Sequence, residues 1–410
     1  MQEIDRSGAL KKPPAVWTER GSPAYRRISL ALFLVGFATF SLVYCVQPLL
    51  PNFAESFGVS VAQSSLALSV TTGTLAFSIM AASVVSEGLG RRAVMFAATS
   101  SAAILNIVAA FAPNWTLLLV ARALEGLVLG GVPAIAMAYL AEEIAPRGLG
   151  FAMGLYVGGT AFGGMFGRVL VGVLTEWTSW RFALAAIGGL GLLAALGFVV
   201  LLPVSRNFTP RKGFEPRWHL EAWSAHLRDK GLLLLFAIGG LTMGAFVTVY
   251  NYAGFRLIAP PYNLSQTQIS LIFMAYLFGI IASSVAGALA DRLGRGPVLI
   301  AGLLIALTGV ALTLLAPLGA VIAGIIVLTF GFFAAHAVAS GWVGRLAQRA
   351  KGHASSLYLL TYYVGSSVMG TLGGRFWSFG GWPSIVAFTG LLFGLALAAA
   401  LILQRRTHKA

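Results

Sequence analysis

Twelve apolar runs of about 20 residues constrain the fold of this chain more than any other feature, because a helix of that length crosses a hydrocarbon core of about 30 Å. Its mean hydropathy of +0.85 and its 10% of charged residues lie outside the range of soluble domains. We therefore expect an all-α integral membrane protein with twelve transmembrane helices. The runs lie near residues 28–50, 64–86, 93–112, 116–140, 149–173, 180–202, 232–256, 268–289, 297–316, 319–343, 354–376 and 383–403.

The longest polar stretch, "SRNFTPRKGFEPRWHLEAWSAHLRDKG", separates the sixth run from the seventh. Within it, Leu220, Trp223 and Leu227 recur at helical spacing among basic residues, which predicts a helix lying at the lipid headgroups. The expected segments are a cytoplasmic tail (1–27), a six-helix bundle (28–203), a cytoplasmic linker (204–231), a second six-helix bundle (232–403) and a cytoplasmic tail (404–410).

Two phrases occur once in each half of the chain. "SVVSEGLGRR" at 83–92 is a blurred copy of "GALADRLGRG" at 287–296, and "YVGGTAFGGMFGR" at 156–168 matches "YVGSSVMGTLGGR" at 363–375. Their offsets of 204 and 207 residues are nearly equal, which predicts two pseudo-symmetric bundles of common plan. Small residues at three- and four-residue spacing in the second pair let helix backbones approach closely.

The net charge of +15 would suggest a nucleic-acid partner in a soluble protein. With a cytoplasmic N-terminus, however, 23 of the 28 Lys and Arg residues fall on one side of the membrane, which is the positive-inside bias. We therefore expect no nucleic-acid partner, both termini in the cytoplasm of a bacterium, and a multi-pass protein of the inner membrane. The single cysteine, Cys45, excludes an internal disulfide and a multi-cysteine metal site.

Three motifs carry a resemblance to a known family. The phrase Gly287-x-x-x-Asp291-Arg292-x-Gly294-Arg295, the segment 118–126 in the fourth run, and the glycine spacing of the fifth run all resemble motifs of the major facilitator superfamily. The segments "VQPLLPNFAESFGVS", "GFFAAHAVAS" and "ASSLYLLTYYVGSS" are most similar to its YnfM-like subgroup of proton-linked drug and sugar antiporters.

This resemblance implies a secondary transporter with a central cavity that opens alternately to each side as the bundles rock. We expect proton-coupled export of small organic molecules by a monomer in lipid, with the proton motive force as energy source and no cofactor or metal. Proton-symport uptake and uncoupled facilitation remain alternatives. A receptor or an enzyme fits less well, because the chain has no H-E-x-x-H, no G-x-S-x-G and no phosphate-binding loop.

Glu125 is the one acidic residue, of thirteen, that lies well inside a span. An ionised carboxylate in hydrocarbon costs at least a few kcal/mol, so its presence needs a reason. We expect Glu125 to carry the coupling proton and Arg122, three residues earlier on the same helical face, to tune its proton affinity. A static ion pair between the two residues and direct contact of Glu125 with the substrate are the alternatives. His336 is the other midspan titratable group and a second candidate for proton transfer.

Polar and amphipathic groups within apolar runs tend to face the interior of a bundle, and an aromatic cavity with a few hydrogen-bonding groups suits small organic molecules. The predicted cavity residues are Tyr44, Gln47, Asn106, Tyr250, Asn251, Tyr358 and Tyr362.

The repeated phrase predicts a gate. Its acid lies at the cytoplasmic end of a span and, by resemblance, faces the positive end of a helix from the opposite bundle, which would form an inner latch. A purely local turn at Gly294 is the alternative. The residues assigned to this latch are Glu87, Arg91, Arg92, Asp291, Arg292 and Arg295. The matched arginines Arg168 and Arg375, near the outer ends of their spans, are assigned to snorkelling or to an outer gate.

Overall fold

A computed structural model describes residues 17–208 and 216–407, apart from the side chains of residues 82–89 and 216. Most of the predicted N-terminal tail, part of the linker and the side chain of Glu87 therefore lie outside the described part of the chain. The first half contains α1 (Pro23–Tyr44), the 3₁₀ turn η1 (Gln47–Leu49), α2 (Leu50–Phe57), α3 (Val61–Ser64), α4 (Leu66–Leu89), α5 (Arg91–Ala110), α6 (Trp115–Leu129), α7 (Val132–Glu143), α8 (Pro146–Trp177) and α9 (Trp180–Leu201). The second half contains α10 (Pro216–Arg228), α11 (Lys230–Ile258), α12 (Gln266–Leu271), η2 (Ile272–Ala275), α13 (Tyr276–Leu293), α14 (Arg295–Leu312), α15 (Leu318–Leu346) and α16 (Lys351–Thr407).

Eleven continuous helical stretches of the described chain are long and apolar enough to cross a membrane. The last of them, α16, leaves helical geometry at Gly380 and Gly381 just before Pro383, so that it holds two spans joined by a sharp bend. The predicted all-α membrane fold with twelve spans is confirmed.

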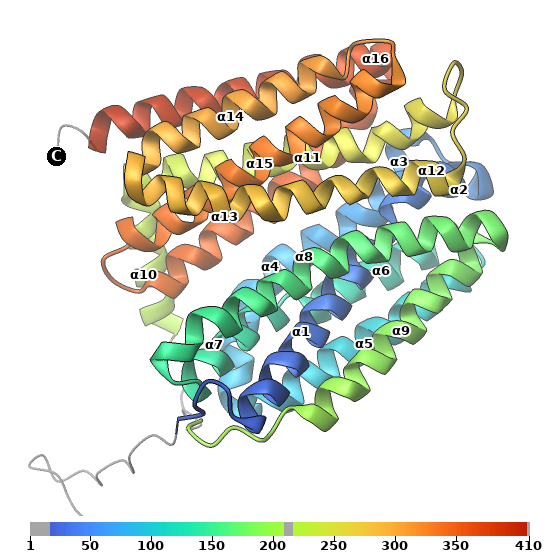
Figure 1. Cartoon of the computed structure of the whole chain (residues 1–410). Helices are drawn as coiled ribbons and strands as arrows, with labels where there is room; N and C mark the ends of the chain where they lie inside the picture. The colour runs from blue at the N-terminus through green and yellow to red at the C-terminus, as the bar shows by residue number, and fades with distance from the viewer. Residues whose placement is uncertain (1–16, 209–215, 408–410) are drawn as a thin grey trace, which may run out of the picture.

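The helices form two groups (Figure 1). Helices α1 to α9 pack together as the first bundle, and α11 to α16 pack together as the second. The bundles diverge toward the end where the described chain begins and finishes, and they meet at the other end, near α2, α3 and α12. We call these the open end and the sealed end.

The first repeated phrase forms the same turn in both bundles. Gly90 joins α4 to α5 with a φ of 85°, and Gly294 joins α13 to α14 with a φ of 88°. Residues with a side chain rarely adopt this region of φ, so the glycine shared by the two copies is needed for the turn at the open end. At the sealed end, capping boxes at Ser60 and Ser265 likewise begin α3 and α12.

The glycines of the second repeated phrase bring helices into close contact. A Cβ at Gly163 of α8 would overlap the main chain of Phe37 in α1, and a Cβ at Gly365 of α16 would overlap the main chain of Gly240 in α11. Because lipid tails are as apolar as leucine, such close backbone packing is what holds membrane helices together.

Candidate functional site

Side-chain hydrogen bonds cross between the bundles at the sealed end. Gln47 Nε2 donates to Asn251 Oδ1 at 2.8 Å, joining η1 to α11, and both residues are at most 2% exposed. Ser367 Oγ of α16 donates to the carbonyl oxygen of Ser69 in α4 at 2.7 Å. Gln266 Nε2 of α12 donates to the carbonyl oxygen of Pro48 at 2.7 Å. These three contacts join different pairs of elements across the two bundles and close this end of the molecule. We call the three contacts the seal.

Between the bundles lies a cavity of about 1330 Å³ that extends toward the open end. Ligand pockets commonly have volumes of about 300 to 1,000 Å³, so the cavity is large enough for a small organic molecule. Its lining residues come from both bundles and from α10: Phe40, Tyr44, Ile79, Pro133, Ala134, Met137, Tyr156, Val157, Thr160, Ala161, Gly164, Arg168, Trp218, His219, Trp223, Met243, Phe246, Tyr276, Ser283, Phe332, Phe333, His336, Ala337, Ser340, Gly352, His353, Ser355, Ser356, Leu359, Tyr362 and Tyr363.

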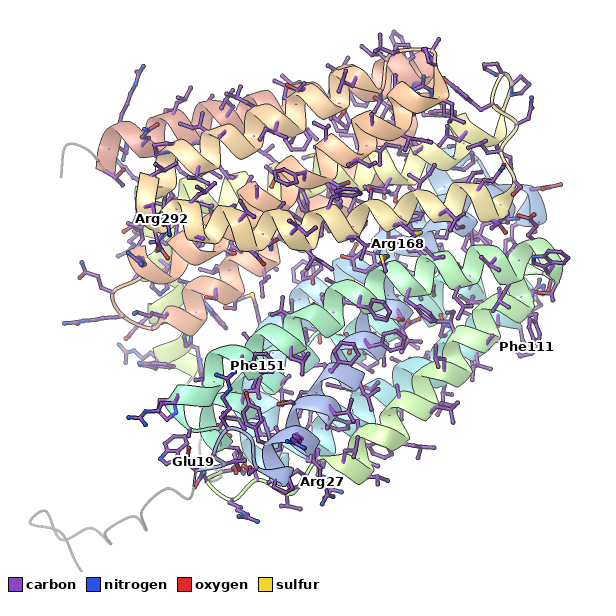
Figure 2. All side chains as sticks on the ribbon, in the orientation of Figure 1. Glu19, Arg27, Phe111, Phe151, Arg168 and Arg292 are labelled. Carbon is purple, nitrogen blue, oxygen red and sulfur yellow. The ribbon has the colours of Figure 1, made fainter. Side chains whose placement is uncertain are left out.

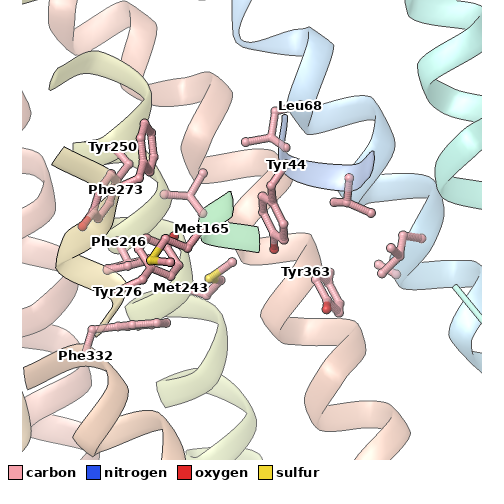
Figure 3. Packing of buried hydrophobic residues seen from close by; sticks show 14 of the residues in the cluster. Tyr44, Leu68, Met165, Met243, Phe246, Tyr250, Phe273, Tyr276, Phe332 and Tyr363 are labelled. Atoms are coloured by element: carbon pink, nitrogen blue, oxygen red, sulfur yellow. The ribbon is translucent and has the colours of Figure 1, made fainter. Parts of the chain in front are cut away.

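Aromatic rings form much of the wall on the side of the second bundle (Figure 3). Phe246 of α11 stacks on Phe332 of α15 with ring centroids 3.9 Å apart, and Tyr276 of α13 meets Phe333 edge-on at 5.4 Å. Tyr44 lies across from this group. A wall of this kind offers ring faces and edges to a flat or apolar ligand.

Arg168 lies where the cavity meets the sealed end (Figure 2), although it is only 1% exposed. Its Nε donates to Gln47 Oε1 at 2.7 Å, and its Nη1 donates to the carbonyl oxygen of Gly164 at 2.7 Å. The guanidinium also faces the rings of Tyr44 at 4.2 Å and Tyr276 at 4.8 Å. Since Gln47 bonds Asn251 in turn, Arg168 is connected directly to the seal between the bundles.

Arg375, the counterpart of Arg168 in the repeated phrase, is exposed. Among the described residues it neither lines the cavity nor has a polar partner. The two assigned gate arginines therefore occupy different surroundings: Arg168 contacts Tyr276 of the second bundle, whereas Arg375 is exposed.

Of the seven predicted cavity residues, Tyr44 and Tyr362 line the cavity. Gln47 and Asn251 are buried in the seal instead. Tyr250 is buried behind the aromatic wall, where its hydroxyl is 2.7 Å from Thr329 Oγ1.

Arg122 and Glu125 lie inside the first bundle, each 0% exposed, with Nη1 and Oε2 2.6 Å apart. Arg122 also donates to the carbonyl oxygens of Leu42 at 3.1 Å and Val43 at 2.6 Å. These carbonyls belong to the last turn of α1, whose oxygens have no partner within the helix. A cation there stabilises the helix end. Arg122 therefore stabilises the interruption between the end of α1 and the start of η1, which we call the break in α1.

Asn106 belongs to the same network rather than to the cavity lining. Its Oδ1 accepts from Arg122 Nη1 at 3.3 Å, and its Nδ2 donates to the carbonyl oxygen of Leu184 at 2.8 Å. Glu125 Oε1, in contrast, has no hydrogen-bond partner among the residues that the structure describes.

His336 lines the cavity, and its Nδ1 is 2.9 Å from the hydroxyl of Tyr358. Its ring lies 4.7 Å from that of Tyr362. His336, Tyr358 and Tyr362, all predicted as site residues, are therefore in contact with one another. His336 and Tyr362 line the cavity, whereas Tyr358 is buried behind them.

At the open end, three of the five latch residues whose side chains the structure describes form ion pairs within their own bundles. Arg91 Nη2 is 2.7 Å from Glu142 Oε1 of α7. Asp291 Oδ1 lies 3.5 Å from Arg345 of α15 and 3.8 Å from Arg295. The remaining two are placed separately: Arg92 donates to the carbonyl oxygen of Val199, and Arg292 is exposed.

Helix α10 of the linker packs against the start of α16 at the mouth of the cavity. His219 Nδ1 is 2.9 Å from His353 Nε2, and Trp223 Nε1 donates to Ser356 Oγ at 3.3 Å. Of its predicted apolar face, Trp223 is partly buried, whereas Leu220 is 62% exposed.

The apolar part of the site was not predicted from the sequence; it consists of Met243, Phe246, Tyr276, Phe332, Phe333 and Tyr363. A polar residue in an apolar run indicates an interior position. An aromatic residue in such a run, in contrast, is as common in a packed core as in a cavity wall, and the sequence contains no feature that separates these two positions.

Comparisons with known proteins agree on one family. The sequence model of the Major Facilitator Superfamily matches residues 32–257 and 241–410. The chain is 46% identical over 395 residues to the inner membrane transport protein YnfM of Escherichia coli K12, covering 96% of this chain and 94% of that protein. It is 43% identical to the uncharacterized MFS-type transporter YybF of Bacillus subtilis 168, covering 93% and 94%.

Solved structures share the fold at low sequence identity. The nucleoside transporter NupG matches with a TM-score of 0.73 and 14% identity, over 92% of this chain and 99% of that one. A bacterial homolog of the human lysosomal transporter Spinster, inward-facing and occupied, matches with a TM-score of 0.75 and 15% identity, over 94% and 98%. Family model, relatives and fold thus agree that the chain is a membrane transporter and belongs to the major facilitator superfamily.

Proposed function

We propose that this transporter is a proton-coupled exporter of small organic molecules that works by alternating access. The observation that carries the proposal is a cavity lined by both bundles, extending toward one end and sealed at the other by hydrogen bonds between the bundles. A transporter that rocks between two states needs such bonds to form in one state and break in the other.

We place the open end in the cytoplasm. The turns at Gly90 and Gly294 and both ends of the described chain lie there, and most of the Lys and Arg residues flank these same segments. The positive-inside bias favours that orientation. The state described would then be the one that takes up a molecule from the cell interior.

The Arg122–Glu125 pair supports proton coupling because it connects a titratable group to the break in α1. Arg122 holds the last carbonyls of α1, and that break positions Tyr44 at the cavity and Gln47 in the seal. Protonation of Glu125 would remove the negative charge that balances Arg122, and so alter how firmly the break is held. A proton would in this way act on the seal without entering the cavity. His336, which lines the cavity, is the second candidate carrier.

The test is transport by purified protein in proteoliposomes that contain a pH-sensitive dye, using compounds that stabilise the protein in a thermal-shift screen of drugs, sugars, organic acids and amino acids. For an antiporter, substrate added to one side drives protons the opposite way. Proton movement in the same direction as the substrate indicates symport, and substrate flux without proton movement indicates facilitation; either result would refute proton-coupled export.

The residue assignment is tested by Glu125→Gln. We expect this variant to insert, to bind the same compounds and to lose proton-driven accumulation, because its side chain cannot exchange a proton. Glu221→Gln is the matched control, since Glu221 lies on α10 with its side chain 68% exposed. Accumulation against a gradient by Glu125→Gln would exclude Glu125 as the proton carrier.

A further inference from the structure

Arg168 differs from the other buried charges of the described chain. Four charged side chains are at most 2% exposed. Arg122 and Glu125 neutralise each other, and the Glu143 carboxylate accepts hydrogen bonds from three donors in the segment that follows α9. Arg168 has no carboxylate within 4 Å among the residues that the structure describes.

The contacts of Arg168 leave part of its guanidinium free to bind. Arginine carries five N–H groups on its side chain. One binds Gln47 and one binds the carbonyl oxygen of Gly164, and no other described residue accepts from the remaining three. The neighbouring rings of Tyr44 and Tyr276 stabilise a cation, but they accept no conventional hydrogen bond. A charge that is only 1% exposed is costly without a counter-charge.

The surroundings of Arg168 also favour an anion. None of the residues that line the cavity is Asp or Glu, so Arg168 is the one permanently charged side chain in that lining. The wall next to it is aromatic, with Tyr276 and Phe273 beside the guanidinium and Phe246 stacked on Phe332 beyond them. A low-dielectric site with one fixed positive charge selects for negative charge.

We infer that the substrate of this cavity is an organic anion with a flat or apolar body. Its carboxylate or a similar group binds the free N–H groups of Arg168, and its body packs on the aromatic wall. A planar guanidinium matches a carboxylate in two parallel hydrogen bonds. As a statement about the transported substrate the inference depends on the proposed function, whereas the binding itself can be measured without transport.

The same arginine connects the ligand to the seal. Gln47 Oε1 accepts from Arg168, and Gln47 Nε2 donates to Asn251 in the other bundle. An anion that draws the guanidinium toward the cavity therefore pulls on the Gln47–Asn251 bond at the sealed end. Arg168 would thus bind the ligand and transmit its binding to the seal.

The first experiment varies the charge of the ligand and needs no variant. Purified protein in detergent is tested by thermal shift against matched acids, primary amides and primary amines built on phenyl, naphthyl, indole and octyl bodies. We expect one or more acids to raise the unfolding temperature, with the matched amide and amine binding about tenfold more weakly or worse.

The second experiment varies the arginine. Arg168→Gln is expected to weaken binding of the stabilising acid by about tenfold or more and to leave its amide unchanged. Arg168→Lys should bind at an intermediate level, because it keeps the charge and loses the planar fork. Arg375→Gln, the exposed counterpart in the repeated phrase, serves as the matched control and should bind as the wild type does.

The inference is overturned if no acid of the panel stabilises the wild type, if amides or amines stabilise it as well as acids do, or if Arg168→Gln keeps the preference for acids. Should Arg168→Gln not fold, the ligand series on the wild type and Arg168→Lys still decide the matter. Binding in detergent involves no proton gradient, so acid binding without proton-coupled flux would refute the proposed coupling and leave this inference standing.

Discussion

Breaking the bond between Gln47 and Asn251 should shift the balance between the two states of the transporter. The bond joins the two bundles at the sealed end, and the alternating access proposed above requires it to break when that end opens. In Asn251→Leu the buried Nε2 of Gln47 loses its acceptor, which costs about 1 to 3 kcal/mol. When the sealed end opens, water would accept a hydrogen bond from Gln47 Nε2. The cost therefore falls only on the state in which that end is closed.

The magnitude follows from the neighbouring contacts. Asn251 Nδ2 has no acceptor among the described residues, so leucine also removes an unsatisfied donor, and the net cost is at the low end, about 1 kcal/mol. That corresponds to about a fivefold change in the ratio of the two states. In Gln47→Leu the Nε of Arg168 loses its acceptor as well, so the cost rises toward about 3 kcal/mol, or about 150-fold.

The assay is a spin-label distance measurement across the sealed end. The background variant is Cys45→Ala, since the native thiol is buried, and labels are placed at Glu55→Cys and Ala259→Cys, which are exposed on opposite bundles. The longer distance should gain population in the order wild type, Asn251→Leu, Gln47→Leu.

Thr389→Val is the matched control. It removes a buried hydroxyl whose hydrogen bonds, to the carbonyl oxygens of Ile385 and Val386, stay within one helix and do not depend on the state. The reasoning fails if both leucine variants keep the wild-type distance distribution, or if Thr389→Val shifts the distribution as much as they do.

Two further changes test stability. Gly163→Ala should lower the unfolding temperature of the purified protein clearly, because its Cβ would overlap the main chain of Phe37, whereas Gly158→Ala on the same helix faces open space and should leave it unchanged; equal effects would contradict the packing argument. Arg122→Met should destabilise by about 3 to 5 kcal/mol, since Glu125 stays buried without a counter-charge, and the double variant Arg122→Met/Glu125→Gln should recover part of the loss. No recovery in the same thermal measurement would mean that the bonds of Arg122 to α1 carry the stability.

The membrane fold follows from the amino-acid sequence alone. Length and hydropathy settle where a helix spans, because a polar backbone in lipid must bond within its own segment. The repeated phrases predicted two bundles of common plan, and the structure places Gly90 and Gly294 at positive φ in both copies. The glycines of 156–168 and 363–375 predicted close helix contacts, which Gly163 and Gly365 make.

The site could be predicted only in part, because a polar residue in an apolar run shows that it faces inward and not which interior it faces. Asn106 and Gln47 look alike in sequence, yet one bonds Arg122 inside a bundle and the other bonds Asn251 between bundles. The end at which the two bundles meet depends on contacts between residues that are 204, 218 and 298 positions apart in the sequence.

The different surroundings of the two matched arginines arise from tertiary contacts. Arg168 and Arg375 end the same phrase, and the local sequence assigns both to the end of a span. Arg168 is enclosed by Gln47 and Tyr44 of its own bundle and by Tyr276 of the second bundle, whereas Arg375 is exposed. The role of a buried charge depends on the groups around it, and those groups come from helices that are distant in the sequence.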